Sequence, residues 1–187
     1  MTRNSAALAA SALMLAACGD TPEADIGAST EDLSGDTLAE IVSDDDSISV
    51  VSGLLESTGI SGALEGEANY TLFAPTDTAM EPLGEAATKA LGDESDGAIA
   101  AAILRNHMVP GALTPDAIRS AIDANDGSVT MATFGLSSLT FALDGETITV
   151  TNADGNSANL TGSSKIGKNG ALLTIDAVLA DSEALQP

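Results

Sequence analysis

The sequence lacks tryptophan and contains only four other aromatic residues, one tyrosine and three phenylalanines. Its hydrophobic core must therefore be built mainly from Ala, Val, Leu and Ile, which are abundant enough in a chain of 187 residues. The one cysteine, Cys18, has no partner for an intrachain disulfide. The one histidine, His107, in a chain without a G-x-S-x-G motif, gives poor support to a hydrolytic triad.

Positive charge is also scarce. Six Lys and Arg residues face 28 Asp and Glu residues, for a formal net charge of −22. Phosphate backbones would be repelled by such a chain, which excludes nucleic acid as a partner. Anionic membranes would be repelled in the same way, so any attachment to a membrane requires a lipid rather than charge.

The N-terminal segment has the layout of a bacterial lipoprotein signal. Arg3 precedes an apolar run over residues 6–17, which ends in the small residues Ala16-Ala17 immediately before Cys18. We predict that 1–17 is a signal peptide and that the Cys18 thiol carries the acyl chains. The apolar run is shorter than the roughly 20 residues that span a bilayer. A buried free cysteine and an ordinary secretory signal are the two alternatives.

The remaining chain divides into three parts. Residues 18–35 are polar, acidic and without periodicity, as in a flexible tether. One domain is predicted over 36–181, followed by a short tail over 182–187. Gly19 follows the cysteine, so no aspartate retention signal is present there, which favours the outer membrane. The predicted location is the bacterial cell envelope, facing the periplasm or the cell surface.

The predicted domain has a helical first half and a strand-rich second half, which indicates an α+β fold. Capping patterns begin two helices, at Thr37 with Glu40 and at Thr114-Pro115. After Gly127 apolar residues alternate with polar ones, and Asp144-Gly145 predicts a two-residue hairpin turn in which both residues have positive φ. Another strand is predicted over 172–178.

Three segments resemble the fasciclin-like domain family. The first is YTLFAPTDTAM (70–80), a buried strand that runs into a proline and a capped helix. The second is ILRNHMVPG (103–111), similar to the family's histidine segment, and the third is NGALLTIDAVL (169–179). The resemblance implies a wedge of β-strands with helices packed around it. It also implies an extracellular adhesion or matrix-binding module, which in bacteria is often secreted or lipid-anchored.

The resemblance also suggests binding residues. A tyrosine–histidine pair is implicated in integrin adhesion by animal members, and Asn106 stands at the tyrosine position before His107. We therefore take His107, Asn106 and Asp77 as candidate binding residues, with no catalytic residue assigned. His107 has a second interpretation, as a structural histidine that bonds backbone groups near a helix end.

Three other polar segments could bind phosphate or calcium, but each also has a purely structural interpretation. Residues 162–169 nearly match a phosphate-binding loop, but Asn169 replaces the hydroxyl residue and a strand follows, so a glycine-rich hairpin is favoured. Residues 44–46 and 152–156 have calcium-type oxygen ligands without a complete twelve-residue loop. A helix cap and a turn are favoured there, and neither a metal nor a cofactor is predicted.

The sequence thus predicts a lipid-anchored binding or adhesion module outside the cytoplasm, recognising an envelope protein, a glycan or a matrix component. The alternative is a carrier of an apolar small ligand such as a pigment or lipid, suggested by the adaptable residues Met80, Met108 and Met131. A third hypothesis, with the least support, is a hydrolase that pairs His107 with Asp77 or Asp176.

Overall fold

The computed structural model describes residues 34–83 and 97–180, so the predicted signal peptide, Cys18, most of the tether and the tail lie outside the described residues. The helical elements are α1 (Leu38–Ser43), η1 (Asp46–Ile48), α2 (Ser49–Ser57), α3 (Ser61–Leu64), α4 (Asp77–Met80), η2 (Glu81–Leu83), α6 (Gly97–Asn106) and α7 (Pro115–Ala124). The strands are β1 (Tyr70–Pro75), β2 (Met108–Pro110), β3 (Ser128–Ala132), β4 (Ser138–Asp144), β5 (Thr147–Asn152), β6 (Ser157–Gly167) and β7 (Gly170–Ile175). The predicted α+β class is confirmed.

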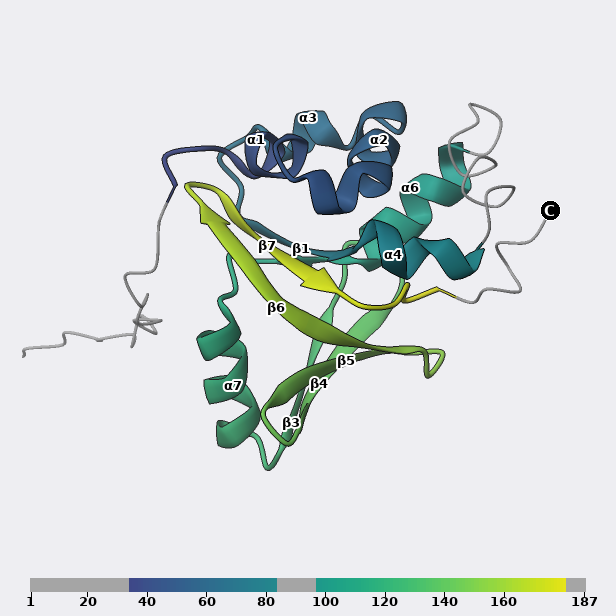
Figure 1. The fold of residues 1–187 in the computed structure, drawn as a ribbon. Coiled ribbons are helices and arrows are strands. Elements are labelled where there is room, and N and C mark those ends of the chain that lie inside the picture. Colours follow the sequence, from purple (N-terminus) through teal and green to yellow (C-terminus); the bar gives the residue numbers. More distant parts are fainter. Residues whose placement is uncertain (1–33, 84–96, 181–187) are drawn as a thin grey trace, which may run out of the picture.

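The strands form one seven-stranded sheet in the order β2-β1-β7-β6-β5-β4-β3. β1 and β7 pair in parallel near one end of this order, with Tyr70 opposite Gly170, and the other pairs are antiparallel. The sheet curls into a barrel-like wedge, with α1, α2 and α3 above it and α7 at its lower side (Figure 1). The Phe134 N–H donates to the Met108 carbonyl at 3.0 Å and links the β2 and β3 ends of the sheet.

Two hydrophobic cores lie on opposite faces of the β1–β7 pair. Successive side chains of a strand point to opposite faces, so Leu72 and Leu172 join the core under the helices. Phe73 and Leu173 join the core inside the wedge, where the Phe73 and Phe141 rings lie 5.2 Å apart. Parallel strands are usually covered on both faces, and here the two strands are almost entirely buried.

The predicted helix starts are confirmed. The Glu40 N–H donates to the Thr37 hydroxyl at 3.2 Å, and the Glu40 carboxylate accepts the Thr37 N–H at 2.7 Å, which completes the capping box. Thr114 caps α7 with Pro115 in the first turn. These local bonds satisfy amide groups that have no partner inside the helix.

The β4–β5 hairpin is present, but its turn lies one residue later than predicted. Asp144 pairs with Thr147, so Gly145 and Glu146 form the turn. Gly145 has φ of +61°, whereas Asp144 does not have positive φ. A turn with glycine at its first central position needs only that one residue in the left-handed region, which explains the shift.

The β6–β7 hairpin has longer strands and a shorter loop than the sequence indicated. β6 extends to Gly167, which pairs with Gly170, so Lys168 and Asn169 alone form the loop. The preferred interpretation of 162–169 as a hairpin is confirmed, although most of that segment is strand. Strand β7 begins at Gly170 and ends at Ile175, earlier at both ends than the predicted 172–178.

The chain enters the described domain beside this hairpin. The Ser34 N–H donates to the Ile166 carbonyl, and the Lys168 N–H donates to the Asp36 carbonyl, each at 3.0 Å. Over residues 34–83 and 97–180 no helix combines the length and the apolarity needed to cross a membrane.

Candidate functional site

Asp77 is held at the start of a neighbouring helix. Its carboxylate accepts the Ser49 N–H at 3.1 Å, the Ser49 hydroxyl at 2.6 Å and the Val50 N–H at 3.0 Å. A carboxylate at this place satisfies unpaired amides and lies at the positive end of the helix dipole. Asp77 therefore joins α4 to α2, and its own helix is capped by Thr76.

His107 is buried, with 2% of its surface exposed, immediately after α6. Its Nδ1 lies 2.9 Å from the Ile103 carbonyl, and its Nε2 accepts the Leu179 N–H at 3.0 Å. Burial lowers the pKa of His107 below its ordinary value, while the bond to Ile103 opposes that shift in part. The described geometry uses both ring nitrogens for backbone groups, as the structural interpretation of this histidine expected.

Asn106 contacts the loop between β3 and β4. The Thr133 hydroxyl donates to its side-chain oxygen at 3.4 Å. The backbone of Gly135 lies so close that an added Cβ would be 1.8 Å from that oxygen. The Gly135 N–H donates to the Arg105 carbonyl at 3.1 Å. The Asn106 side chain and this backbone bond thus hold the β3–β4 loop against the C-terminal end of α6.

The three candidate residues do not converge on one polar site in the described part of the chain. His107 and Asn106 are neighbours in sequence, but the first bonds the segment after β7 and the second bonds the β3–β4 loop. Asp77 bonds α2 instead of the imidazole, and Asp176 bonds Asn159. A binding role for these residues stays a prediction.

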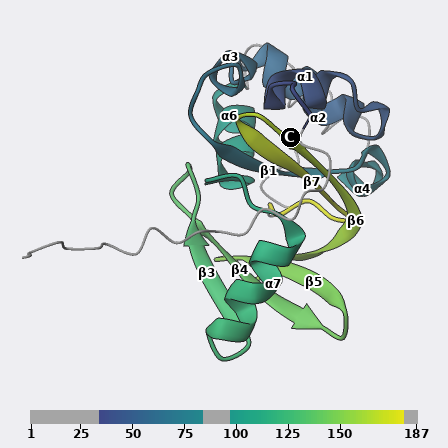
Figure 2. The ribbon, with the colours of Figure 1, turned by 90° about the vertical axis from the view of Figure 1, so that its left-hand side faces the viewer.

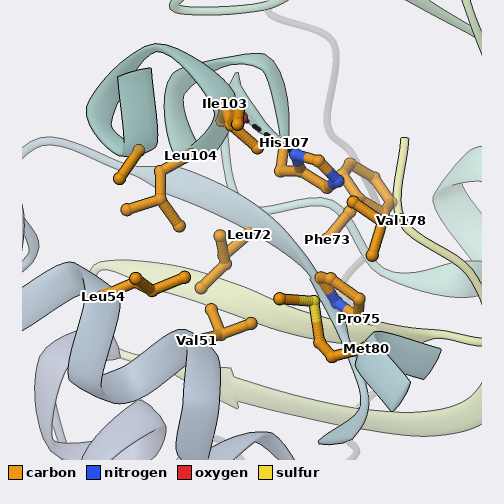
Figure 3. A pocket seen from close by; sticks show the side chains of 11 residues that line it. Val51, Leu54, Leu72, Phe73, Pro75, Met80, Ile103, Leu104, His107 and Val178 are labelled. Atoms are coloured by element: carbon orange, nitrogen blue, oxygen red, sulfur yellow. Dashed lines mark hydrogen bonds between the residues drawn. The ribbon is translucent and has the colours of Figure 1, made fainter. Parts of the chain in front are cut away.

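An apolar pocket lies beside His107, between α2, α6, β1 and the segment after β7. In Figure 3 His107 lies near Phe73 and Val178, and Met80 lies near Val51 and Pro75. The cavity volume is about 20 Å³, which is room for roughly one water molecule. The pocket in this conformation is therefore too small for the pigment or lipid of the carrier hypothesis.

The other motifs singled out in the sequence form local structure. Asp45 accepts the Ser47 N–H at 3.0 Å at the start of η1, and pairs with Lys165 at 3.1 Å. The Asn152 side-chain oxygen accepts two backbone N–H groups within its turn. The preferred cap and turn interpretations are both confirmed. In residues 34–83 and 97–180, no three His, Cys, Asp or Glu residues cluster to hold a metal ion.

The sequence analysis did not identify the structural roles of two polar residues, Asn169 and Arg119. Asn169, which stands out in the sequence only as a departure from a phosphate-binding loop, is 3% exposed and accepts the Leu38 N–H at 2.7 Å. Its amide donates to the Leu64 carbonyl at 2.7 Å and to the Gly66 carbonyl at 2.5 Å. Arg119, on α7, belongs to no motif in the sequence, yet it lines a second pocket. No local pattern indicates either role, because their partners are distant in sequence.

Comparison with known proteins agrees with this geometry. The solved structure of a FAS1 domain pair from the insect cell adhesion molecule Fasciclin I matches with a TM-score of 0.69 at 18% identity. The match covers 80% of this chain and 52% of that one, so the chain spans about half the length of the pair. Among curated proteins none matches. The fasciclin domain model matches residues 46–181, and the chain therefore belongs to the fasciclin domain family.

Proposed function

We propose that this protein is a lipid-anchored binding module that recognises a partner outside the cytoplasm through its fasciclin domain. The observation that carries the proposal is the family match over residues 46–181. Fasciclin domains commonly serve as extracellular binding or adhesion modules. The partner is an envelope protein, a glycan or a matrix component, and the mechanism is non-covalent surface recognition without catalysis.

The described geometry is consistent with recognition by a rigid surface. The candidate polar side chains Asp77, His107 and Asn106 are engaged in bonds that hold elements together. His107 is a poor general base, because backbone groups engage both of its ring nitrogens and protonation of Nε2 would break the bond that it accepts from the Leu179 N–H. The domain is thus suited to present a fixed shape to a partner.

The anchoring part of the proposal comes from the sequence. Cys18 closes a lipoprotein-type signal, and the acidic segment over 18–35 separates it from the domain. Fully extended, that segment reaches about 60 Å. A chain with a net charge of −22 gains nothing from an anionic bilayer, so the acyl chains supply the membrane contact.

The test measures binding of the purified, labelled protein to envelope preparations from cells that lack it. We expect saturable binding that excess unlabelled protein displaces. Binding that does not saturate, or that excess unlabelled protein leaves unchanged, contradicts the proposal. Extraction of the same protein with organic solvent provides a second measurement: a stoichiometric pigment or lipid would favour the carrier alternative instead.

A further inference from the structure

Two exposed apolar side chains lie together in the loop between β3 and β4. Leu136 stands fully in solvent, with a relative exposure of 108%, and Phe134 is 44% exposed. Among the large apolar side chains of residues 34–83 and 97–180, only Ile99 and Leu143 are also exposed. A single exposed apolar residue is ordinary on a protein surface, whereas a pair at one loop tip is a candidate contact with a partner or a membrane.

Backbone hydrogen bonds hold this loop in a fixed shape. The Thr133 N–H donates across the loop to the Ser137 carbonyl at 3.1 Å, and the Phe134 N–H donates to β2 at 3.0 Å. The Gly135 N–H donates to the last turn of α6 at 3.1 Å. Backbone groups that enter a bilayer must be paired within the protein, because lipid tails offer no partner. Three consecutive N–H groups of the loop already meet that condition.

The sequence around the loop carries no charge. No Asp, Glu, His, Lys or Arg occurs from residue 127 to residue 143, which is the longest such run in the described residues. Charged side chains are costly to transfer into a bilayer, and the whole chain has a formal net charge of −22. The β3–β4 loop is therefore a part of this acidic protein that can enter lipid without removing a charge from water.

The loop also lies on the side of the sheet where the chain enters the domain. The Asp36 carbonyl accepts the N–H of Lys168 in the β6–β7 loop, and the next carbonyl, of Asn169, accepts the N–H of Tyr70 at 3.3 Å. The Tyr70 ring meets the Phe134 ring edge-on, with centroids 5.1 Å apart. Figure 2 shows the β3–β4 loop beside α6 and β1, at the opposite end of β3 from its connection to α7.

This position favours a lipid bilayer over a protein pocket as the apolar surface that covers the pair. As a flexible chain, the predicted tether over 18–35 has a root-mean-square span of about 25 Å. The acyl chains proposed at Cys18 then keep the chain entry, and the loop beside it, close to the membrane. Two apolar side chains alone bind lipid weakly, so the loop contact depends on the high local concentration that the anchor provides.

We propose that the tip of the β3–β4 loop, with Leu136 and Phe134, inserts into the surface of the bilayer that carries the acyl chains. This inference rests on the proposed function, because it requires the anchor at Cys18. The insertion fixes the orientation of the domain on the membrane. The β4–β5 hairpin and the C-terminal end of α7 then face away from the lipid, where a partner can reach them (Figure 2).

The experiment exploits the absence of tryptophan from the chain. Leu136→Trp introduces a single fluorescent side chain at the loop tip, and the full-length acylated protein is reconstituted into uncharged vesicles of phosphatidylcholine and phosphatidylethanolamine. We expect its emission to shift to shorter wavelength than that of the same variant carrying Cys18→Ser in buffer. Brominated lipids should quench it. The matched control is Leu143→Trp, which replaces an exposed leucine at the other end of β4 and should emit as in water without quenching.

A second measurement uses the unaltered loop, because a tryptophan can itself favour the membrane surface. The wild-type acylated protein is placed in bicelles of the same two lipids with a nitroxide-labelled lipid, and its backbone amides are followed by NMR. The amides of residues 134–137 should lose more intensity than those of residues 143–147. Equal losses in the two segments overturn the proposal.

The fluorescence has outcomes that contradict insertion directly. The proposal is overturned if vesicle-bound Leu136→Trp emits as in water, or if lipid quenches Leu143→Trp as strongly. It is also overturned if the Leu136→Trp emission shifts with envelope preparations but not with lipid vesicles, since a protein then covers the loop.

Flotation of the same vesicles separates this inference from the proposed function. Protein that floats with the vesicles while its loop stays in water overturns the insertion and leaves the anchored binding module intact. Protein that does not float contradicts the anchor and the insertion together. Saturable binding to envelope preparations then still decides whether the domain recognises a partner.

Discussion

The Nε2 atom of His107 accepts the backbone N–H of Leu179 at 3.0 Å, across 72 residues of sequence. An acceptor nitrogen carries no proton, so Nδ1 carries it and donates to the Ile103 carbonyl at 2.9 Å. The neutral ring thereby joins the end of α6 to the segment that follows β7. Protonation of Nε2 would place its new N–H opposite the Leu179 N–H, so that two donors would face each other without an acceptor.

We predict that this contact weakens as the pH falls. Burial lowers the pKa of His107 in the folded protein, whereas the unfolded chain has the ordinary value of about 6.5. The unfolded state therefore binds more protons below about pH 6.5, and the free energy of unfolding decreases by up to about 1.4 kcal/mol per pH unit until the folded pKa is reached. Urea unfolding between pH 7.5 and 5.5 measures this slope.

The many carboxylates also titrate towards the acid end, so the comparison is made against His107→Gln at each pH. The difference in unfolding free energy between wild type and the variant should be largest at pH 7.5 and should shrink towards pH 5.5. A difference that is independent of pH would show that the ring is not held neutral in the folded protein.

Asp77→Ala should reduce stability without changing the fold. The substitution removes the carboxylate that accepts two backbone N–H groups and one hydroxyl at the start of α2. Loss of a helix cap costs about 1–2 kcal/mol, measured as the change in unfolding free energy in urea. Asp154→Ala is the matched control, because Asp154 is exposed in a turn and should change stability by less than about 0.5 kcal/mol.

Two glycine-to-alanine substitutions should have opposite signs. A Cβ on Gly170 would lie 2.4 Å from the Tyr70 carbonyl oxygen and 2.8 Å from a Leu38 methyl group, so Gly170→Ala must displace β1 or α1. We expect a loss of about 1–3 kcal/mol. A Cβ on Gly53, in α2, would meet no atom of another element within 4 Å, so Gly53→Ala should gain about 0.5–1 kcal/mol. Thermal melts of the two variants check both signs, and equal effects would contradict the argument.

Cys18→Ser should release the protein from the membrane fraction while its circular dichroism and melting temperature stay unchanged. The hydroxyl cannot carry the thioether-linked lipid, and the acidic surface offers no charge-based substitute. Fractionation of cells that express the variant measures this. If the variant stayed with the membranes as completely as the wild type, another segment would be the anchor.

Features encoded over a few residues were the most predictable from sequence. The Thr37–Glu40 capping box and the Thr114-Pro115 helix start appear as expected because cap and partner lie within one turn. The β4–β5 hairpin was predictable too, although its turn moved by one residue once Asp144 paired with Thr147. Strand β6 was not predicted, because its bulge interrupts the alternation of apolar and polar residues that is typical of a strand.

The sequence by itself determined the family, the α+β class, the cap positions and the expected lipid address at Cys18, because each is written in short, contiguous patterns. Only the tertiary structure decided that β1 and β7 lie in parallel with a core on either face, since that pairing joins segments about 100 residues apart. It likewise decided what Asp77, His107 and Arg119 contact. The role of a polar side chain depends on which backbone groups the fold leaves without a partner, and those groups are distant in sequence.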